Sequence, residues 1–257
     1  MPILTRSDYD HFRKYGYLIR EDLLTQSESK DFLGLFDSDR KEHRYRWHPY
    51  GYRQHVSYDA LVTTLDFDRV LRHPKILGAI EELMGGPTCF GELGARYMGP
   101  YDGETHQSWH RDRPHWPDHP YRMDYIQLML YLTDVNKTTH CFSLSPESID
   151  DPILNDKQAQ LDRGGCTHIY GPAGTICLFN IAVLHTATTR PTKAERKTLQ
   201  AYYGHRDRPF LANDSIIPPL FWKNHPDPEV RAFYGNLNTV TRTYAKSFGI
   251  ETLDELS

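Results

Sequence analysis

Two imidazoles and one carboxylate occur in this sequence at a spacing that could hold a single metal ion. His110 and Asp112 lie in the run Ser108-Trp-His-Arg-Asp112, and residues i and i+2 of an extended segment point to the same face. His185 closes an apolar, β-rich run that a Pro-Ala-Gly turn opens at Gly174, so we expect one strand to end in this histidine. Two histidines and one carboxylate on one face of an ion are typical of non-haem iron(II) sites that activate oxygen.

Two further His-x-Asp triplets show how specific this signal is. With 14 histidines and 22 aspartates in 257 residues, about one such triplet is expected by chance. Neither His205-Arg-Asp207 nor His225-Pro-Asp227 is followed by a histidine on a later strand, and Asp227 is better explained as a helix N-cap. Only the first triplet has such a histidine and also an arginine, Arg196, eleven residues beyond His185.

This combined pattern resembles that of the phytanoyl-CoA dioxygenase-like family of iron(II)/2-oxoglutarate oxygenases, which repeats His-x-Asp, then His, then Arg eleven residues later. Residues 8–20 are similar to the opening helix and first strand of that family, and residues 73–85 to its second helix. The resemblance covers about residues 5–205. The family's usual Asn-Gly and Pro-Gly-Ser-His are replaced over Thr139–Ser148, and a lysine often found before the iron strand is missing near Arg96–Met98. Substrates of individual members therefore cannot be transferred to this chain.

The resemblance implies three cofactors or cosubstrates, namely Fe(II), 2-oxoglutarate and O2. It implies that the catalytic metal ligands are His110, Asp112 and His185. In the family an arginine meets the far carboxylate of 2-oxoglutarate, and its planar fork suits bidentate pairing. Arg196 is favoured over Arg190, because Arg190 precedes a proline in an expected turn, where arginines are usually solvated.

Other candidate contacts are assigned more loosely. Gln127 lies on the polar face of an alternating strand, and Trp116 follows the iron triplet where relatives often carry tryptophan; both are candidates for the cosubstrate site. Candidate substrate contacts flank the triplet: Arg96, Tyr101, His106 and Arg113. The segment 43–55 concentrates aromatic and cationic side chains, which fits either a lid over the site or a solvated loop.

The expected activity is an oxidation coupled to release of succinate and CO2. Hydroxylation of a small polar metabolite or natural-product intermediate is the default outcome, with desaturation or ring closure as variants. A carboxylate at position 112 leaves no iron position for chloride, which argues against halogenation. Two alternatives stay open: a cupin-like metal enzyme that does not use 2-oxoglutarate, with Arg196 structural, and a catalytically silent binding relative.

Hydrophobic periodicity predicts helices first, strands in the middle and a helix at the end. The expected helices cover residues 5–15, 25–36, 74–84 and 227–244, and the expected strands include residues 16–19 and the alternating run 125–133. We predict a mainly β fold with flanking helices and a double-stranded β-helix core of the jelly-roll or cupin type. A single oxygenase domain over 1–257 is expected, with a helical part at 5–85, a β-core at 86–205 and a C-terminal loop and helix at 206–250.

Composition restricts the partners. A net charge of −4 and a pI near 6.4 give no bulk attraction for phosphate backbones, so we expect no nucleic-acid partner. No apolar stretch approaches the roughly 18 residues of a membrane span, and the first residues lack the apolar core of a signal peptide. The four cysteines show no Cys-x-x-Cys spacing. We therefore expect a cytoplasmic enzyme with a small-molecule substrate and no membrane contact, while the oligomeric state is left open.

Overall fold

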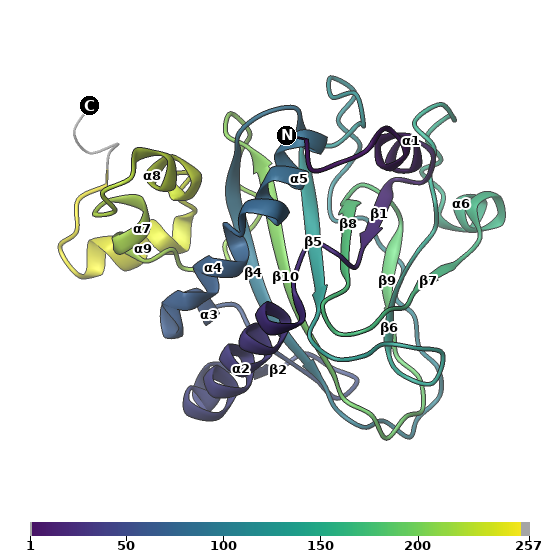
Figure 1. Cartoon of the computed structure of the whole chain (residues 1–257), viewed down its shortest axis with the longest axis horizontal. Coiled ribbons are helices and arrows are strands. Elements are labelled where there is room, and N and C mark those ends of the chain that lie inside the picture. Colours follow the sequence, from purple (N-terminus) through teal and green to yellow (C-terminus); the bar gives the residue numbers. More distant parts are fainter. Residues whose placement is uncertain (1, 253–257) are drawn as a thin grey trace.

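Two antiparallel sheets form the centre of the computed structural model, which describes residues 2–252 (Figure 1). The ends of the predicted domain, residue 1 and residues 253–257, lie outside the described residues. The larger sheet has the order β1 (Tyr17–Arg20), β8 (Ile176–Asn180), β5 (Tyr125–Tyr131), β10 (Arg196–His205), β4 (Thr88–Met98), β3 (Gln54–Ser57), β2 (His48–Pro49). The smaller sheet has the order β7 (Thr167–Ile169), β6 (Cys141–Leu144), β9 (His185–Thr188). The predicted mainly β fold with flanking helices is confirmed.

Strand β5 shows why the two faces of the larger sheet differ. Ile126, Leu128 and Leu130 pack into the core on the helix side. Met129 and Tyr131 belong to a second core cluster that includes residues of the smaller sheet. The alternation that predicted this strand is therefore confirmed, and the second face is the one that the site uses.

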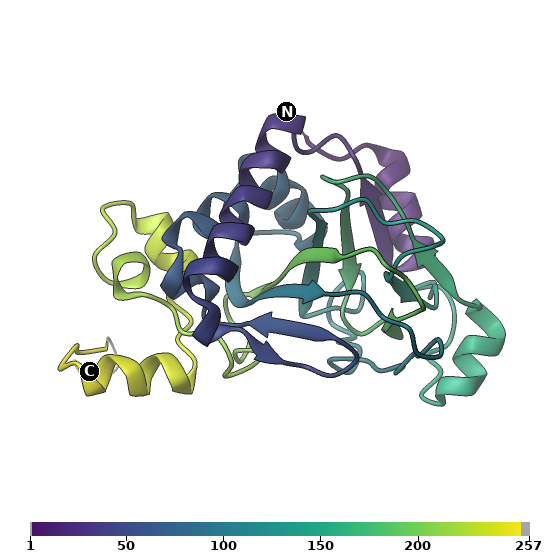
Figure 2. The same ribbon diagram turned by 90° about the horizontal axis from the view of Figure 1, so that it is seen from below.

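Helices cover the outer face of the larger sheet (Figure 1). They are α2 (Gln26–Glu42), α3 (Ala60–Thr63), α4 (Asp68–Leu71) and α5 (Pro74–Met84), while α1 (Arg6–Tyr15) lies beside β1. Both α1 and α2 begin at a threonine whose hydroxyl accepts from the backbone three residues on, in capping boxes with Asp8 and Glu28. The predicted helices at 5–15 and 74–84 are confirmed, and the one at 25–36 extends to Glu42. Helix α6 (Lys157–Gly164) and the C-terminal helices stand at opposite ends of the molecule (Figure 2).

The run from Gly174 to His185 is not one strand, which corrects the prediction. Strand β8 ends at Asn180, whose side chain accepts from Ala182 N at 2.9 Å and whose carbonyl accepts from Val183 N at 2.9 Å. These bonds turn the chain, so His185 begins β9 in the smaller sheet instead of ending a strand of the larger one.

The C-terminal helix predicted over 227–244 is also wrong, because the chain is divided into α8 (Pro228–Tyr234) and α9 (Thr239–Ser247), after a short α7 (Pro219–Trp222). Gly235 ends α8, and Asn238 begins α9 by accepting from Thr241 N at 2.9 Å. The expected N-cap at Asp227 is confirmed, since its carboxylate accepts from Glu229 N at 2.9 Å.

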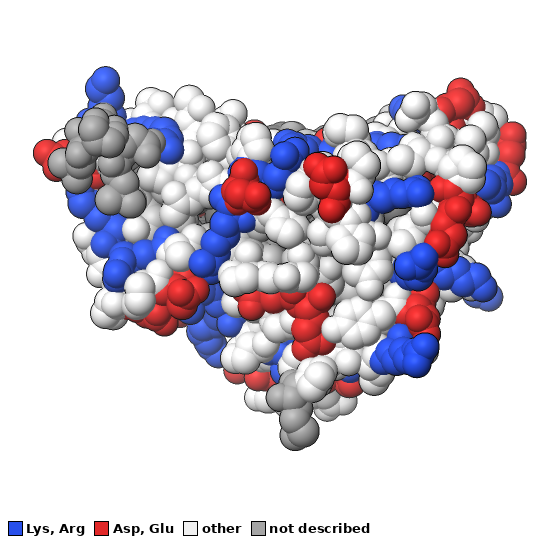
Figure 3. Space-filling view, turned by 90° about the horizontal axis from the view of Figure 1, so that it is seen from above, with Lys and Arg blue, Asp and Glu red and all other residues white. Residues whose placement is uncertain are grey.

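Charges on the surface are mixed. On the face drawn in Figure 3, Lys and Arg side chains are interspersed with Asp and Glu instead of forming one basic area. Among the helices of residues 2–252, none combines the length and the apolar character that a bilayer crossing requires.

Candidate active site

His110, Asp112 and His185 meet between the two sheets. Their ligand atoms all lie within 4.8 Å of one another, and no other group of three His, Cys, Asp or Glu side chains in residues 2–252 does so. Asp112 Oδ1 lies 3.4 Å from Nε2 of His110, and Asp112 Oδ2 lies 3.5 Å from Nε2 of His185. Two imidazole nitrogens and one carboxylate oxygen at this separation could hold one divalent cation and leave its other positions open.

Main-chain hydrogen bonds bring the two distant segments together. The backbones of His110 and His185 exchange bonds of 3.0 and 2.9 Å, and Asp112 N donates to Ile181 O at 3.1 Å. The run around His110 is extended but is not a regular strand, and its residues i and i+2 share a face as expected. Arg111, between the two ligands, instead pairs with the buried carboxylate of Glu147.

The orientation of both imidazoles is fixed by carbonyl groups two residues earlier. His110 Nδ1 donates to Ser108 O and His185 Nδ1 donates to Val183 O, each at 2.8 Å. Because a carbonyl only accepts, Nδ1 of each ring carries the proton and Nε2 is left free for a metal. The carboxylate is held by Tyr202, whose hydroxyl donates to Asp112 Oδ2 at 3.0 Å.

Electrostatics keep the carboxylate charged. Burial alone would raise the pKa of Asp112, but the hydrogen bonds that it accepts from the protonated forms of His110 and His185 hold that pKa well below its usual range. The same contact with Asp112 raises the pKa of His110, so protons compete with a metal for its Nε2 at acid pH. Burial and the nearby Asp112 raise the pKa of Tyr202, so its hydroxyl remains a donor.

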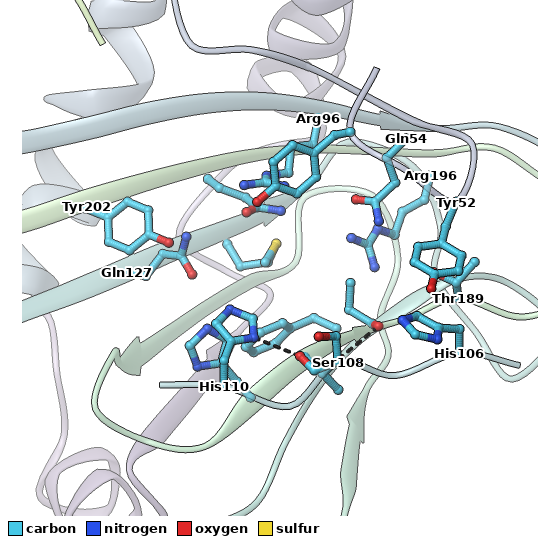
Figure 4. A pocket seen from close by; sticks show the side chains of 17 residues that line it. Tyr52, Gln54, Arg96, His106, Ser108, His110, Gln127, Thr189, Arg196 and Tyr202 are labelled. Carbon is cyan, nitrogen blue, oxygen red and sulfur yellow. Dashed lines mark hydrogen bonds between the residues drawn. The ribbon is translucent and has the colours of Figure 1, made fainter. Parts of the chain in front are cut away.

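A cavity of about 430 Å³ extends from the two histidines to β10 and β4. In Figure 4, Arg196 and Arg96 lie on the strand side of this cavity, opposite His110. Its lining consists of Tyr50, Tyr52, Gln54, Arg96, His106, Ser108, His110, Gln127, Met129, Phe142, His185, Thr186, Ala187, Thr189, Arg196, Gln200 and Tyr202.

Arg196, the first residue of β10, is a buried cation without a counter-ion. Its side chain lines the cavity, the residue is 1% exposed, and its Nε and Nη1 atoms have no hydrogen-bond partner. Within residues 2–252 no carboxylate forms an ion pair with it, and burial lowers its pKa. Leaving charged donors unpaired is costly, so this site fits an anionic group from a ligand.

Arg190, the alternative arginine, has partners for both of its terminal nitrogens, although its buried Nε has none. Its Nη1 donates to Lys137 O at 2.8 Å, and its Nη2 lies 3.2 Å from Cys141 Sγ. It is not among the residues that line the cavity.

Three more of the predicted contacts line the cavity. Gln127 is 2% exposed, and its Nε2 has no hydrogen-bond partner. Arg96 and His106 contribute their side chains from β4 and from the segment before the metal ligands.

The structure places the other three predicted contacts outside this cavity. Trp116 Nε1 donates to Asp118 at 3.1 Å, Arg113 pairs with Asp124 at 2.7 Å, and Tyr101 lines a separate hollow near Thr192. After Asp112 the chain turns away from the metal ligands, so closeness in sequence does not bring Arg113 or Trp116 into the cavity.

Several lining residues were not found from the sequence. Gln200 and Tyr202 alternate with Arg196 along β10, so extending the strand periodicity from Arg196 would have found them. The segment 43–55 does reach the site, because Tyr50 and Tyr52 line the cavity. The ring of Tyr52 stacks on His106 with centroids 3.9 Å apart.

Comparisons with known proteins agree with this geometry. The family model for phytanoyl-CoA dioxygenase (PhyH) matches residues 12–198. No curated protein matches the chain in sequence. Solved structures of low identity share the fold, a jelly roll of the predicted kind.

Three solved structures illustrate this similarity. The non-heme alpha ketoglutarate dependent carbocyclase SnoK from nogalamycin biosynthesis is 16% identical, with a TM-score of 0.67 over 80% of this chain and 86% of its own. EctD from S. alaskensis with 2-oxoglutarate and 5-hydroxyectoine is 14% identical, with a TM-score of 0.69 over 93% and 87%. HygX from Streptomyces hygroscopicus with nickel, 2-oxoglutarate and hygromycin B is 16% identical, with a TM-score of 0.62 over 80% and 88%. With the family match over residues 12–198 and a candidate metal site of the matching type, the chain belongs to the phytanoyl-CoA dioxygenase family of 2-oxoglutarate-dependent non-haem iron oxygenases.

Proposed function

We propose that this enzyme hydroxylates a small polar metabolite or natural-product intermediate, with desaturation or ring closure as the variants of the same chemistry. The observation that carries the proposal is the unpartnered Arg196 in the same cavity as His110 and His185, two of the three candidate metal ligands. A metal site alone would fit many enzymes, whereas a metal site facing a buried free guanidinium fits a ligand that chelates the metal at one end and is anionic at the other. The dicarboxylate 2-oxoglutarate has these two ends.

His110, Asp112 and His185 are the proposed iron ligands and the catalytic centre. Bound iron(II) and 2-oxoglutarate supply the oxidation by O2, with release of succinate and CO2. The chain's own contribution is orientation, because the carbonyl partners of both histidines present Nε2 and Tyr202 fixes the carboxylate.

Arg196 is the proposed partner of the far carboxylate of 2-oxoglutarate. Its planar fork can pair with both carboxylate oxygens, and burial strengthens the pairing by excluding water. The free amide nitrogen of Gln127 is a second donor for the cosubstrate. The thioether side chain of Met129 and the aromatic ring of Phe142 form an apolar wall of the cavity.

The substrate class is supported by cavity size and by the structural neighbours. The cavity of about 430 Å³ must hold both cosubstrate and substrate, which favours small molecules. SnoK comes from nogalamycin biosynthesis, and the structures of EctD and HygX contain 5-hydroxyectoine and hygromycin B. These structural neighbours therefore act in the chemistry of small molecules or bind them. The mixed charge on the face drawn in Figure 3 gives no support for a nucleic-acid partner there, and the cytoplasmic location stays a prediction from the sequence.

We also propose that the chain forms one oxygenase domain. The C-terminal helices pack on the larger sheet, since the ring of Tyr234 lies 5.4 Å from that of Phe90 and the ring of Phe233 lies 5.9 Å from that of Tyr203. This contact joins the segment after β10 to the core.

The test is a titration of purified protein with iron(II) and then 2-oxoglutarate without oxygen, followed by the visible charge-transfer band of the chelate. We expect the band in the wild type, its loss in Asp112→Ala and its weakening in Arg196→Gln. Asp207→Ala is the matched control, because Asp207 is an exposed residue of another His-x-Asp triplet, and its substitution should leave the band unchanged. Metal binding without a band would overturn the proposal in favour of a cupin-like enzyme that does not use 2-oxoglutarate.

A further inference from the structure

A second guanidinium faces the same cavity and is not needed to explain the cosubstrate. Arg96 lies in β4 between two tyrosine rings, with its guanidinium carbon 4.4 Å from the centroid of Tyr50 and 5.8 Å from that of Tyr58. Its Nη2 donates to the hydroxyl of Tyr58 at 3.0 Å, and its buried Nε has no hydrogen-bond partner. The side chain is therefore held in place by rings while part of its donor fork is left free.

No carboxylate of residues 2–252 forms an ion pair with Arg96. An adjoining hollow of about 240 Å³ that Arg96 also borders is lined by the carboxyl groups of Glu92, Asp112 and Asp214. The cavity of about 430 Å³ that Arg96 shares with Arg196 has no carboxyl group of the described residues in its lining. The side of the guanidinium that faces this larger cavity is consequently the one open to an anion.

Strand register separates Arg96 from the cosubstrate arginine. In the pairing of β10 with β4, Arg196 lies opposite Met98, Thr198 opposite Arg96 and Tyr202 opposite Glu92. Arg96 is thus two residues further along the sheet than Arg196, in the direction of Tyr202, whose hydroxyl reaches the metal ligand Asp112. Arg196 therefore lies at the far end of the cavity, and Arg96 lies closer to the candidate metal ligands.

We propose that the substrate is a small carboxylic acid whose carboxylate pairs with Arg96, which places an oxidisable carbon of the same molecule beside the metal ligands. This inference rests on the proposed function and specifies its substrate class. A planar carboxylate matches the geometry of the fork better than a point charge does. The rings of Tyr50 and Tyr52 cover the same part of the cavity and restrict the space around the bound acid.

The experiment uses the protein loaded with iron(II) and saturating 2-oxoglutarate in the absence of oxygen. The probes are small carboxylic acids, each compared with its own primary amide, and binding is read from the rise of the melting temperature with probe concentration. We expect acids to bind and their amides to bind much more weakly. In Arg96→Gln the affinity for the acid should fall by roughly 10- to 100-fold, and Arg96→Lys should recover only part of it.

Two controls make the result specific. Arg96→Gln should keep the charge-transfer band, which shows that the metal and cosubstrate sites are intact. Arg113→Gln should keep the preference for acids, because Arg113 pairs with Asp124 outside the cavity. An acid that binds should also stimulate succinate release when oxygen is admitted.

The inference is overturned if acids and amides bind equally, if no acid binds, or if Arg96→Gln retains the preference for acids. Loss of the band in Arg96→Gln would assign Arg96 to the cosubstrate instead and would also overturn it. A missing band in the wild type would overturn the proposed function itself, so the two failures can be told apart.

Discussion

Replacing Arg196 with methionine should stabilise the protein without its ligands and at the same time remove its affinity for 2-oxoglutarate. The guanidinium is buried with two nitrogens unpaired, and burial lowers its pKa, which means that folding disfavours the charge. Methionine has a flexible, apolar side chain that can fill much of the same space. Exchanging buried ionic groups for apolar ones often stabilises proteins by about 1–4 kcal/mol.

The two effects have opposite signs and can be measured separately. A gain of about 1–3 kcal/mol corresponds to a rise of roughly 2–10 °C in the melting temperature of a chain of this size. Two charge-assisted hydrogen bonds of about 1.5–3 kcal/mol each are lost from the complex, which weakens 2-oxoglutarate binding by roughly 10²- to 10⁴-fold. Calorimetry of the ligand-free protein gives the first value, and anaerobic titration of the iron-loaded protein gives the second.

Arg190→Met is the matched control, because Arg190 is bonded to Lys137 O and contacts Cys141 Sγ. This variant should lose stability and bind 2-oxoglutarate as the wild type does. The reasoning is refuted if Arg196→Met melts at a lower temperature than the wild type, or if its affinity for 2-oxoglutarate stays within about threefold of the wild-type value.

Three other variants test separate contacts. Tyr202→Phe removes the hydroxyl that donates to Asp112 and should weaken metal binding about 10- to 100-fold in a competition titration with a chelator; unchanged affinity would contradict this role. Glu147→Ala removes the carboxylate partner of the partly buried Arg111 and the acceptor of Leu184 N, and should cost about 3–5 kcal/mol in urea unfolding; a loss under about 1 kcal/mol would exclude the contacts of Glu147 as stabilisers. Burial and a nearby carboxyl group raise the pKa of Glu92 from 4.5 to about 8, so between these values the folded chain keeps a proton that the unfolded chain releases. Stability should therefore fall as the pH rises through this range, and melting curves of Glu92→Gln should show a flatter dependence.

His110 and Asp112 could be predicted because an extended run places them on one face whatever its neighbours are. His185 and Arg196 were predicted from their spacing, which matches the family's pattern, although His185 begins a strand and does not end one. Strand β5 could be predicted because its alternating side chains face two different cores.

The strand boundary before His185 could not be read from hydropathy, because Ile181–Leu184 are as apolar and as buried as the strand that precedes them. Only Asn180, whose side chain caps the turn, marks the end of β8. The break between α8 and α9 did have local signals, since Gly235 and Asn238 are residues that end and begin helices. Of the cavity lining, Arg96 and His106 could be predicted because they lie shortly before the metal ligands, whereas Tyr50, Tyr52 and Gln54 could not be assigned because the hairpin of β2 and β3 lies far from those ligands in sequence.

Both metal-binding imidazoles are oriented by backbone carbonyl groups of their own segments, at Ser108 and Val183. Every amino acid carries such a carbonyl, so a changed side chain at either position does not remove the acceptor. Val183 is held by packing in the core, whereas the exposed Ser108 can be substituted while the orientation of His110 is kept. Ser108 lines the cavity, so enzyme engineers can vary position 108 to reshape its wall while His110 keeps its acceptor, a freedom that a carboxylate-oriented imidazole would not offer.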